Sequence, residues 1–112
     1  MLIKGIGTDI TRRDRMTFDI AKRILSDSEI KIMNSYEGEE AQLRFASGRW
    51  AAKESIIKAS SKEISFDQVE ILKDADGKPY VKYSGHLGVE FQISISHEDL
   101  YSIAFCIMAH KE

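Results

Sequence analysis

The chain has 112 residues, of which 43% are hydrophobic and 30% are charged, and its formal net charge is −2. This is the length and composition of one globular domain, so we expect a single domain over residues 1–112. The small net charge excludes a strong global field that would attract nucleic acid or an anionic membrane. A chain this short has a small core, and assembly into an oligomer would add stability and shared sites.

The cysteine content and the N-terminus narrow the class of protein further. Cys106 is the only cysteine and stands in an apolar run, which excludes a disulfide framework and a metal–thiolate cluster and predicts a buried thiol. The N-terminus lacks the pattern of a signal peptide, and no apolar stretch is long enough to cross a bilayer. We therefore expect a cytoplasmic location.

The spacing of apolar residues in the first third of the chain predicts a strand followed by two helices. Residues 1–10 alternate apolar positions and then meet two glycines and a Thr-Asp pair, which predicts a short strand that ends in a tight turn. Residues 14–25 have helical spacing. Ser26 or Ser28 then supplies an N-cap for a second helix over residues 27–36.

Residues 37–60 form the longest segment with helical spacing, because apolar side chains recur at intervals of three and four. Gly48 stands inside this segment and lowers its helix propensity. A glycine at such a position is explained by close packing, which we expect here.

After Ser60 the apolar pattern changes to a period of two. Strands are predicted over residues 66–72 and 79–84, joined by an Asp-Gly hairpin turn, and over residues 90–97 and 100–109. The sequence therefore predicts an α+β fold, in which helices from the first half pack on an antiparallel meander from the second half. The N-terminus adds one strand to this sheet.

Basic side chains are concentrated near the predicted first helix. Residues 10–25 contain five basic and two acidic side chains, namely Arg12, Arg13, Arg15, Lys22 and Arg23 against Asp14 and Asp19. Such a segment is suited to an acidic partner, and it is equally compatible with a solvated helix of mixed charge. The sequence alone leaves both interpretations open.

Three residues of the long helix, Trp50, Glu54 and Lys58, are four positions apart and lie on one stripe. The common explanation is a surface ion pair between Glu54 and Lys58, which contributes little stability. The alternative is half of a metal site. Mg²⁺ binds one or two carboxylates together with substrate phosphates and water, so Glu54 would need a second acid such as Asp9. Lys58 would then hold the same phosphate.

Other motifs carry weaker signals. The segment "GIGTD" has neither the dinucleotide fingerprint nor the P-loop pattern. His97 ends a predicted strand beside Ser94 and Ser96, where it would suit a phosphate or a ribose, although a lone histidine is more often structural. The "DADG" segment lacks the spacing of a calcium-binding EF-hand and favours the hairpin turn.

Three segments in order resemble a known family: "GIGTDIT" at residues 5–11, "GRWAAKESIIKA" at 48–59 and "SISHEDLYSIAF" at 94–105. Together they are similar to the holo-[acyl-carrier-protein] synthases, the small 4′-phosphopantetheinyl transferases. The similarity extends to "RILSDSEI" and "DGKPY", and so covers nearly the whole chain. Each segment is a weak signal alone, but the ordered set is specific.

The resemblance implies a 4′-phosphopantetheinyl transferase-like fold and an enzyme of fatty acid biosynthesis. It would transfer the phosphopantetheine arm of coenzyme A to a serine of apo acyl carrier protein, with Mg²⁺, and release adenosine 3′,5′-bisphosphate. By match to the family motifs, Asp9 and Glu54 would be catalytic metal ligands and Lys58 would contact the phosphates. Arg49 and His97 would bind the coenzyme at the adenosine 3′-phosphate end.

The resemblance also implies partners. Arg15 matches a family position that docks the acidic carrier protein, and Arg12, Arg13, Lys22 and Arg23 would steer the same partner. Members of the family are typically homotrimers with active sites between subunits. For the chemistry, our hypothesis is that Glu54, or a metal-bound water oriented by Glu54 or Asp9, accepts the serine proton, and the sequence does not choose between them.

The chain departs from the family at two places, and other functions stay open at this point. Ser55 replaces the alanine of the family's Lys-Glu-Ala, and residues 60–66 contain no glycine where the family has a glycine-containing loop. One alternative is a non-catalytic module that binds a carrier protein or a nucleotide. A second is a Mg²⁺-dependent phosphohydrolase, and a third is a purely structural oligomer.

Overall fold

The computed structural model describes residues 2–112. Its helices are α1 (Phe18–Ile24), α2 (Asp27–Asn34) and α3 (Glu39–Ala59), with short 3₁₀ turns η1 (Arg13–Arg15) and η2 (Phe66–Gln68). Its strands are β1 (Ile3–Arg12), β2 (Val69–Lys73), β3 (Pro79–Tyr83), β4 (Val89–His97) and β5 (Tyr101–His110). The predicted α+β class is confirmed, with helices in the first half and β-strands mainly in the second.

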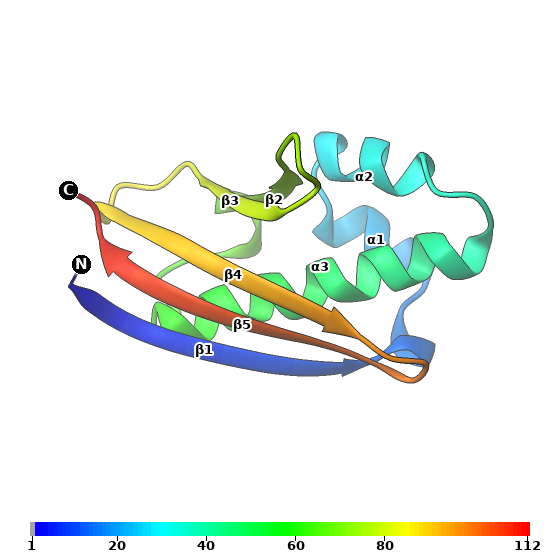
Figure 1. Cartoon of the computed structure of the whole chain (residues 1–112), viewed down its shortest axis with the longest axis horizontal. Coiled ribbons are helices and arrows are strands. Elements are labelled where there is room, and N and C mark those ends of the chain that lie inside the picture. The colour runs from blue at the N-terminus through cyan, green and yellow to red at the C-terminus, as the bar shows by residue number, and fades with distance from the viewer. Residues whose placement is uncertain (1) are drawn as a thin grey trace.

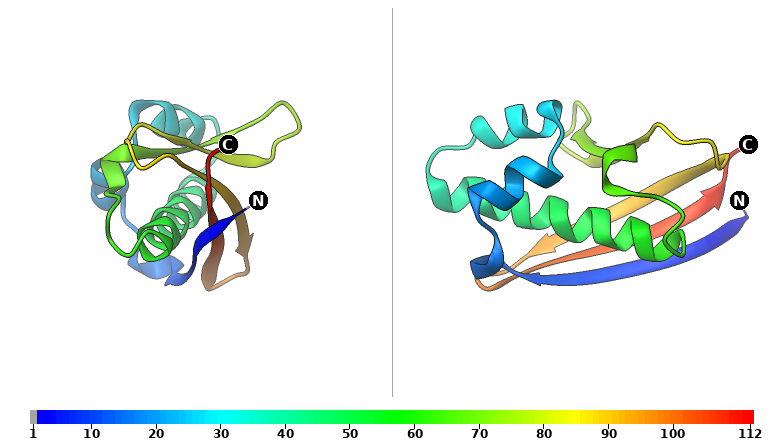
Figure 2. Two further views of the ribbon diagram at one scale, coloured as in Figure 1. Left: turned by 90° about the vertical axis from the view of Figure 1, so that its left-hand side faces the viewer. Right: turned by 180° about the vertical axis from the view of Figure 1, so that it is seen from behind.

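Helix α3 lies between two layers (Figure 1). On one side it packs against a three-stranded antiparallel sheet of order β1-β5-β4. On the other side α1 and α2 cover it, as the view from behind shows (Figure 2). Two apolar clusters fill these layers, one around Ile56 facing the strands and one around Phe45 facing α1 and α2. The long helix thus connects both halves of the core.

The predicted meander is only partly right, because the strands of residues 2–112 form two sheets. β2 and β3 pair as a separate hairpin, with Ile71 opposite Val81. The predicted Asp-Gly turn is confirmed, and Gly77 adopts a φ of +81° there. β3 then packs against β4 through side chains, with the Tyr83 and Phe91 rings edge to face at 5.7 Å. Ring packing therefore takes the place of the expected ladder.

The prediction that the first strand ends at the glycines is wrong. β1 continues through Gly5 and Gly7 to Arg12. A Cβ atom at Gly7 would lie 1.9 Å from the carbonyl oxygen of Ser55, and one at Gly5 would lie 2.0 Å from that of Ala59. The glycines therefore allow α3 to approach β1 closely instead of forming a turn.

The helix predicted over residues 14–25 is divided. The chain makes the 3₁₀ turn η1, extends through Met16, and starts α1 at Phe18, where the hydroxyl of the N-cap Thr17 accepts a hydrogen bond from the Ile20 amide at 3.2 Å. The threonine cap and the burial of Met16 explain the interruption. The basic residues are consequently distributed over β1, η1 and α1.

Three further predictions are confirmed. Ser26 caps α2, which ends at Asn34, two residues before the predicted end. Gly48 packs closely, because a Cβ there would lie 2.6 Å from Cε1 of His97. Cys106 is buried, and burial raises the pKa of its thiol to about 12. Within residues 2–112, the helices are too short or too polar to span a membrane.

Candidate functional site

A cavity of about 570 Å³ opens between β1, α1 and α3, and both Asp9 and Glu54 line it. Asp9 lies within β1 on the face that packs against α3, and Glu54 lies on the facing side of the helix. The close approach at Gly5 and Gly7 brings these two elements together. The structure therefore places the two carboxylates in one cavity, although 45 positions separate them in the sequence.

Lys58 forms its ion pair with Asp9. The helix spacing alone had suggested a surface pair with Glu54 instead. The Lys58 ammonium is 3.1 Å from Asp9 Oδ1 and donates to the carbonyl of Thr8 at 3.0 Å. The other carboxylate oxygen, Oδ2, accepts a hydrogen bond from the hydroxyl of Thr11 at 2.9 Å. These contacts fix the Asp9 carboxylate and place a positive charge at the rim of the cavity.

The pKa of Glu54 reflects its proximity to Asp9 and Lys58. Partial burial raises the pKa of Glu54, the negative charge of Asp9 raises it further, and Lys58 opposes both. Two neighbouring carboxylates, one of them partly desolvated, are a favourable environment for a divalent cation. Within the described residues no set of three His, Cys, Asp or Glu side chains converges. Two carboxylates still fit Mg²⁺, because substrate phosphates and water supply its remaining ligands.

The rest of the cavity wall is largely apolar. Met16, Ile20, Trp50 and Tyr101 form it, with Arg12 and Arg15 at the same opening. Trp50 also packs edge to face on the Phe66 ring at 5.3 Å, which holds it in place. Sequence analysis identified the stripe of Trp50 and Glu54. It did not identify Met16, Ile20 or Tyr101, because apolar residues in these elements are indistinguishable from core residues.

Arg49 and His97 line a different cavity, of about 380 Å³, beside the N-terminal half of α3. Arg44, Lys73 and Tyr36 line it as well, and among the described residues no acidic side chain does so. The cavity is therefore basic, which would suit an anion. Sequence analysis did not identify Arg44 or Lys73, which lie on separate elements without a local motif. Within one chain, then, the predicted site residues are divided between two cavities.

One hydrogen-bonding contact and the surrounding positive charges define the state of His97 in this second cavity. Its Nδ1 lies 2.9 Å from the hydroxyl of Ser102. Desolvation lowers the pKa of His97, and the positive charges of Arg44, Arg49 and Arg13 lower it further. The imidazole is therefore neutral at neutral pH.

Arg49 is buried, with a relative exposure of 5%, yet part of its guanidinium has no partner. Nε donates to the carbonyl of Ile71 at 3.0 Å, and Cζ lies 4.3 Å from the centre of the Phe45 ring. Nη2 is buried and forms no hydrogen bond with any described residue. Desolvation lowers the pKa of Arg49, while Glu29 and Tyr36 oppose the change. A buried donor without a partner is suited to an anion.

The basic residues expected to meet a carrier protein have different environments. Arg15 is exposed and lines the first cavity, and Lys22 and Arg23 are exposed in the last turn of α1. Arg12 pairs with Asp14 at 2.6 Å. Arg13 is engaged within the chain, because it donates to the carbonyl of Asp99 at 2.9 Å and pairs with Glu40 at 3.2 Å.

Comparison with known proteins supports the predicted resemblance. Residues 5–106 match the 4′-phosphopantetheinyl transferase superfamily. A holo-[acyl-carrier-protein] synthase of Petrotoga mobilis is 31% identical over 121 residues, covering 99% of this chain and 100% of that protein. Another from Listeria monocytogenes is 38% identical over 106 residues, covering 86% of this chain and 89% of that protein.

The fold agrees with solved structures of the same family. The crystal structure of a holo-(acyl-carrier-protein) synthase from Bacillus anthracis in complex with CoA (3′,5′-ADP) matches with a TM-score of 0.85 and 30% identity. The match covers 99% of this chain and 100% of that one. The predicted fold class, resemblance and enzyme class are thus confirmed. The chain belongs to the holo-[acyl-carrier-protein] synthase family within the 4′-phosphopantetheinyl transferase superfamily.

Proposed function

We propose that the chain transfers 4′-phosphopantetheine from coenzyme A to a serine of apo acyl carrier protein and releases adenosine 3′,5′-bisphosphate. One observation carries the proposal: in a member of this family, Asp9 and Glu54 line a single cavity and Lys58 contacts Asp9. In phosphoryl transfer the protein mainly positions groups and stabilises charge, and this cavity offers groups for both tasks.

Asp9 and Glu54 would hold Mg²⁺, which when bound polarises the phosphate oxygens and stabilises the charge that develops on them. Lys58, at the rim, is placed to contact the same phosphates once its ammonium leaves Asp9. Glu54, or a water oriented by Glu54 or Asp9, would accept the serine proton. The apolar wall around Trp50 would exclude water from the transfer.

Arg49 and His97 would bind the 3′-phosphate of coenzyme A. The basic cavity and the free Nη2 of Arg49 support this assignment. Within one chain, however, this cavity is separate from that of Asp9 and Glu54. A coenzyme that contacts both sets of residues is explained if two copies of the chain contribute one set each, so we propose a homotrimer with active sites between subunits.

The outer face of the three-stranded sheet supports assembly. Ile6 and Ile10 on β1 and Ile103 and Phe105 on β5 are exposed there, and Ile10 is directly opposite Ile103 in the ladder. A contiguous apolar patch on a sheet is typical of a protein interface. Burial of this face against other copies would also enlarge the small core.

We further propose that Arg15, with Arg12, Lys22 and Arg23, docks the acidic carrier protein beside the cavity. Arg15 lies at the cavity itself, so a partner held there would present its serine to Asp9 and Glu54. The whole chain would act as one transferase domain in the cytoplasm, in fatty acid biosynthesis.

The experiment is to incubate the protein with coenzyme A and Mg²⁺, with and without apo acyl carrier protein, and to quantify adenosine 3′,5′-bisphosphate by chromatography. Release that requires the acceptor is the expected result. Release without the acceptor would identify a phosphohydrolase instead. Absence of release with several carrier proteins would contradict catalysis and leave a binding module.

A further inference from the structure

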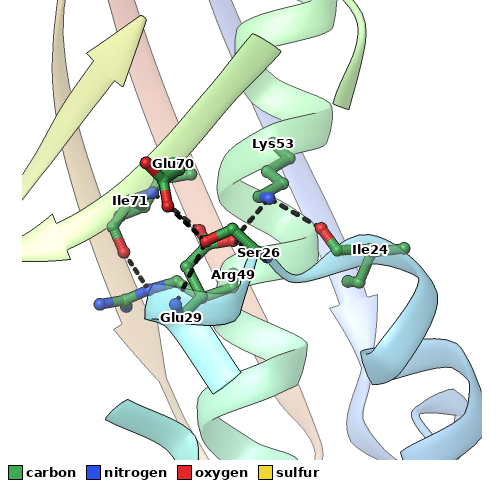
Figure 3. Close-up of polar contacts among 7 residues, drawn as sticks. All are labelled: Ile24, Ser26, Glu29, Arg49, Lys53, Glu70 and Ile71. Carbon is green, nitrogen blue, oxygen red and sulfur yellow. Dashed lines mark hydrogen bonds and ion pairs between the residues drawn. The ribbon is translucent and has the colours of Figure 1, made fainter. Parts of the chain in front are cut away.

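Two opposite charges are fully enclosed beside α3, away from the Asp9 cavity. Glu29 on α2 has a relative exposure of 0% and Lys53 on α3 of 1%, and their charged atoms are 2.7 Å apart. Figure 3 shows them at the centre of a group that joins α1, α2, α3 and β2. Enclosing two charges costs desolvation energy that their attraction only partly repays. Stability alone is therefore a weak explanation for the pair.

The two carboxylate oxygens of Glu29 accept hydrogen bonds from different parts of the fold, one from the helices and the other from the hairpin. Oε1 accepts from the Lys53 ammonium at 2.7 Å and from the amide of Ser26 at 2.8 Å. Oε2 accepts from the amide of Ile71 on β2 at 2.7 Å. Lys53 also donates to the carbonyl of Ile24, at the end of α1, at 2.7 Å. Glu29 is thus the only group drawn in Figure 3 that contacts both Lys53 and Ile71.

Ile71 links this carboxylate to Arg49. In an antiparallel ladder the amide and the carbonyl of one residue point to the same side of the strand. Both groups of Ile71 are bound by side chains, the amide by Glu29 and the carbonyl by Nε of Arg49 at 3.0 Å. Glu29 and Arg49 therefore act together as a substitute for a neighbouring strand along this edge of β2 (Figure 3).

The contact with Ile71 determines how the rest of the Arg49 guanidinium lies. Nε is held by the strand and Cζ by the Phe45 ring, so the plane of the group is fixed at two points. Nη2 is then left without a partner among the described residues, and Arg49 lines the basic cavity with Arg44 and His97. A fixed fork of donors loses little freedom when it binds an anion.

We propose that Glu29 is a positioning residue, which holds the β2 strand so that Ile71 orients Arg49 toward the phosphate of the bound nucleotide. This inference rests on the proposed role of Arg49 in binding coenzyme A. Glu29 itself does not contact the cavity. The negative charge of Glu29 also opposes the lowering of the Arg49 pKa by burial.

The test is a calorimetric titration with two nucleotides that differ in one phosphate, adenosine 3′,5′-bisphosphate and adenosine 5′-monophosphate. Wild-type protein should prefer the bisphosphate. In Glu29→Gln combined with Lys53→Met, which removes both buried charges together, we expect this preference to fall about tenfold, while the affinity for the monophosphate stays unchanged. Glu70→Gln is the matched control, because Glu70 accepts from the Ser26 hydroxyl at 2.5 Å but does not contact Arg49.

A double variant that folds, assembles and keeps the wild-type preference would overturn the proposal, as would equal losses for both nucleotides. Arg49→Lys provides a second test if the double variant fails to fold. Lysine keeps the charge but cannot bind Ile71 and an anion through separate nitrogens of one plane. We expect Arg49→Lys to lose the preference too, and full retention would show that orientation is unnecessary.

The same preparations separate this inference from the proposed function. If wild-type protein prefers the bisphosphate but transfers nothing to a carrier protein, the proposed activity fails while the positioning role is still decided by the variants. If wild-type protein binds the two nucleotides equally well, Arg49 does not bind the 3′-phosphate and the positioning role is overturned.

Discussion

The ammonium of Lys58 on α3 lies 3.1 Å from the carboxylate of Asp9 on β1, which links the helix to the sheet at the opening of the cavity. Glu54, one helical turn before Lys58, faces the same cavity with a raised pKa. In the free protein, Lys58 thus partly neutralises Asp9, while Glu54 is partly desolvated. Both features fit a site that is completed by a cation and a phosphate.

Replacement of Glu54 by glutamine should abolish transfer without loss of the fold. The two side chains are close in size, but the amide neither binds Mg²⁺ as strongly nor accepts a proton, so we expect kcat to fall about 100-fold or more. Without metal, the unfolding temperature should not decrease, because one of two facing carboxylates is removed. Activity at the wild-type level would contradict the assignment of Glu54 as a metal ligand.

Reversal of charge at Arg15 should weaken the use of carrier protein more than the use of coenzyme A. In Arg15→Glu we expect the KM for carrier protein to rise about tenfold, with a smaller change for coenzyme A. Lys82→Glu is the control, because Lys82 is exposed on β3, outside the cavity. Equal effects of Arg15→Glu on both substrates would argue against docking.

The depressed pKa of His97 predicts a pH dependence of coenzyme binding. A bound phosphate offsets the charges of Arg44, Arg49 and Arg13, raises the pKa and favours the imidazolium. As the pH falls from about 7.5 to 6, the KM for coenzyme A should therefore improve in wild-type protein relative to His97→Gln. The KM profile of His97→Gln shows the part of the pH dependence that comes from ionisation of the phosphate. Identical profiles for wild-type protein and the variant would exclude this role of His97.

The same shift makes a prediction for stability in the absence of ligand. The unfolded chain takes up a proton on His97 near pH 6.5, its ordinary pKa, whereas the folded chain does so only at lower pH. The contribution of His97 to stability is therefore fully present above about pH 6.5 and is lost as the pH falls from this value to the lower pKa of the folded chain. Urea unfolding at two pH values should show a smaller loss for His97→Gln than for wild-type protein.

The turn after α3 should be stabilised by a glycine. Ser61 and Lys62 have φ angles of +54° and +68°, and the amide of Lys62 donates to the carbonyl of Ile57 at 2.9 Å, which forms a Schellman-type helix end. Ser61→Gly relieves the strain and should raise the free energy of unfolding by about 0.5–1 kcal/mol. Ser28→Gly, inside α2, should instead lower it by about 0.5 kcal/mol. A lower free energy of unfolding for Ser61→Gly would contradict the presence of backbone strain at Ser61.

A charge on the outer face of the sheet should dissociate the proposed oligomer. Phe105 is 42% exposed in one chain, and Phe105→Glu should shift the mass measured by sedimentation toward that of a monomer. Tyr80→Glu, at a site with 45% exposure on the hairpin, should not do so. If active sites lie between subunits, transfer falls together with assembly, and a monomeric variant with full activity would contradict shared sites.

The elements most accurately predicted from sequence are those with a strong local signal. The Asp-Gly hairpin, the long helix and the two last strands follow from turn chemistry and apolar periodicity. Gly5 and Gly7 misled the analysis, because a glycine at a turn and a glycine at a close approach look alike in sequence. Only the carbonyls of α3, about 50 positions away, distinguish the two cases.

The residues of the site were harder to predict from the sequence than the fold. Spacing placed Glu54 and Lys58 on one stripe, and the ligand needs of Mg²⁺ together with the family resemblance suggested Asp9 as the second acid. Only the structure shows that Asp9 and Glu54 line the same cavity. Arg44 and Lys73 have no local pattern that marks them as cavity residues. The pairing of Glu29 with Lys53 was also missed, because charged residues at a capping position and on a helix are ordinarily solvated.

The most direct measurement is the intact mass of an apo acyl carrier protein after incubation with this protein, coenzyme A and Mg²⁺, with a chelator in a parallel sample. We expect a mass increase of one phosphopantetheine arm that is absent when the chelator is present. An unchanged mass with several carrier proteins would contradict transfer. An equal mass increase in the presence of chelator would contradict the role of Asp9 and Glu54 as a metal site.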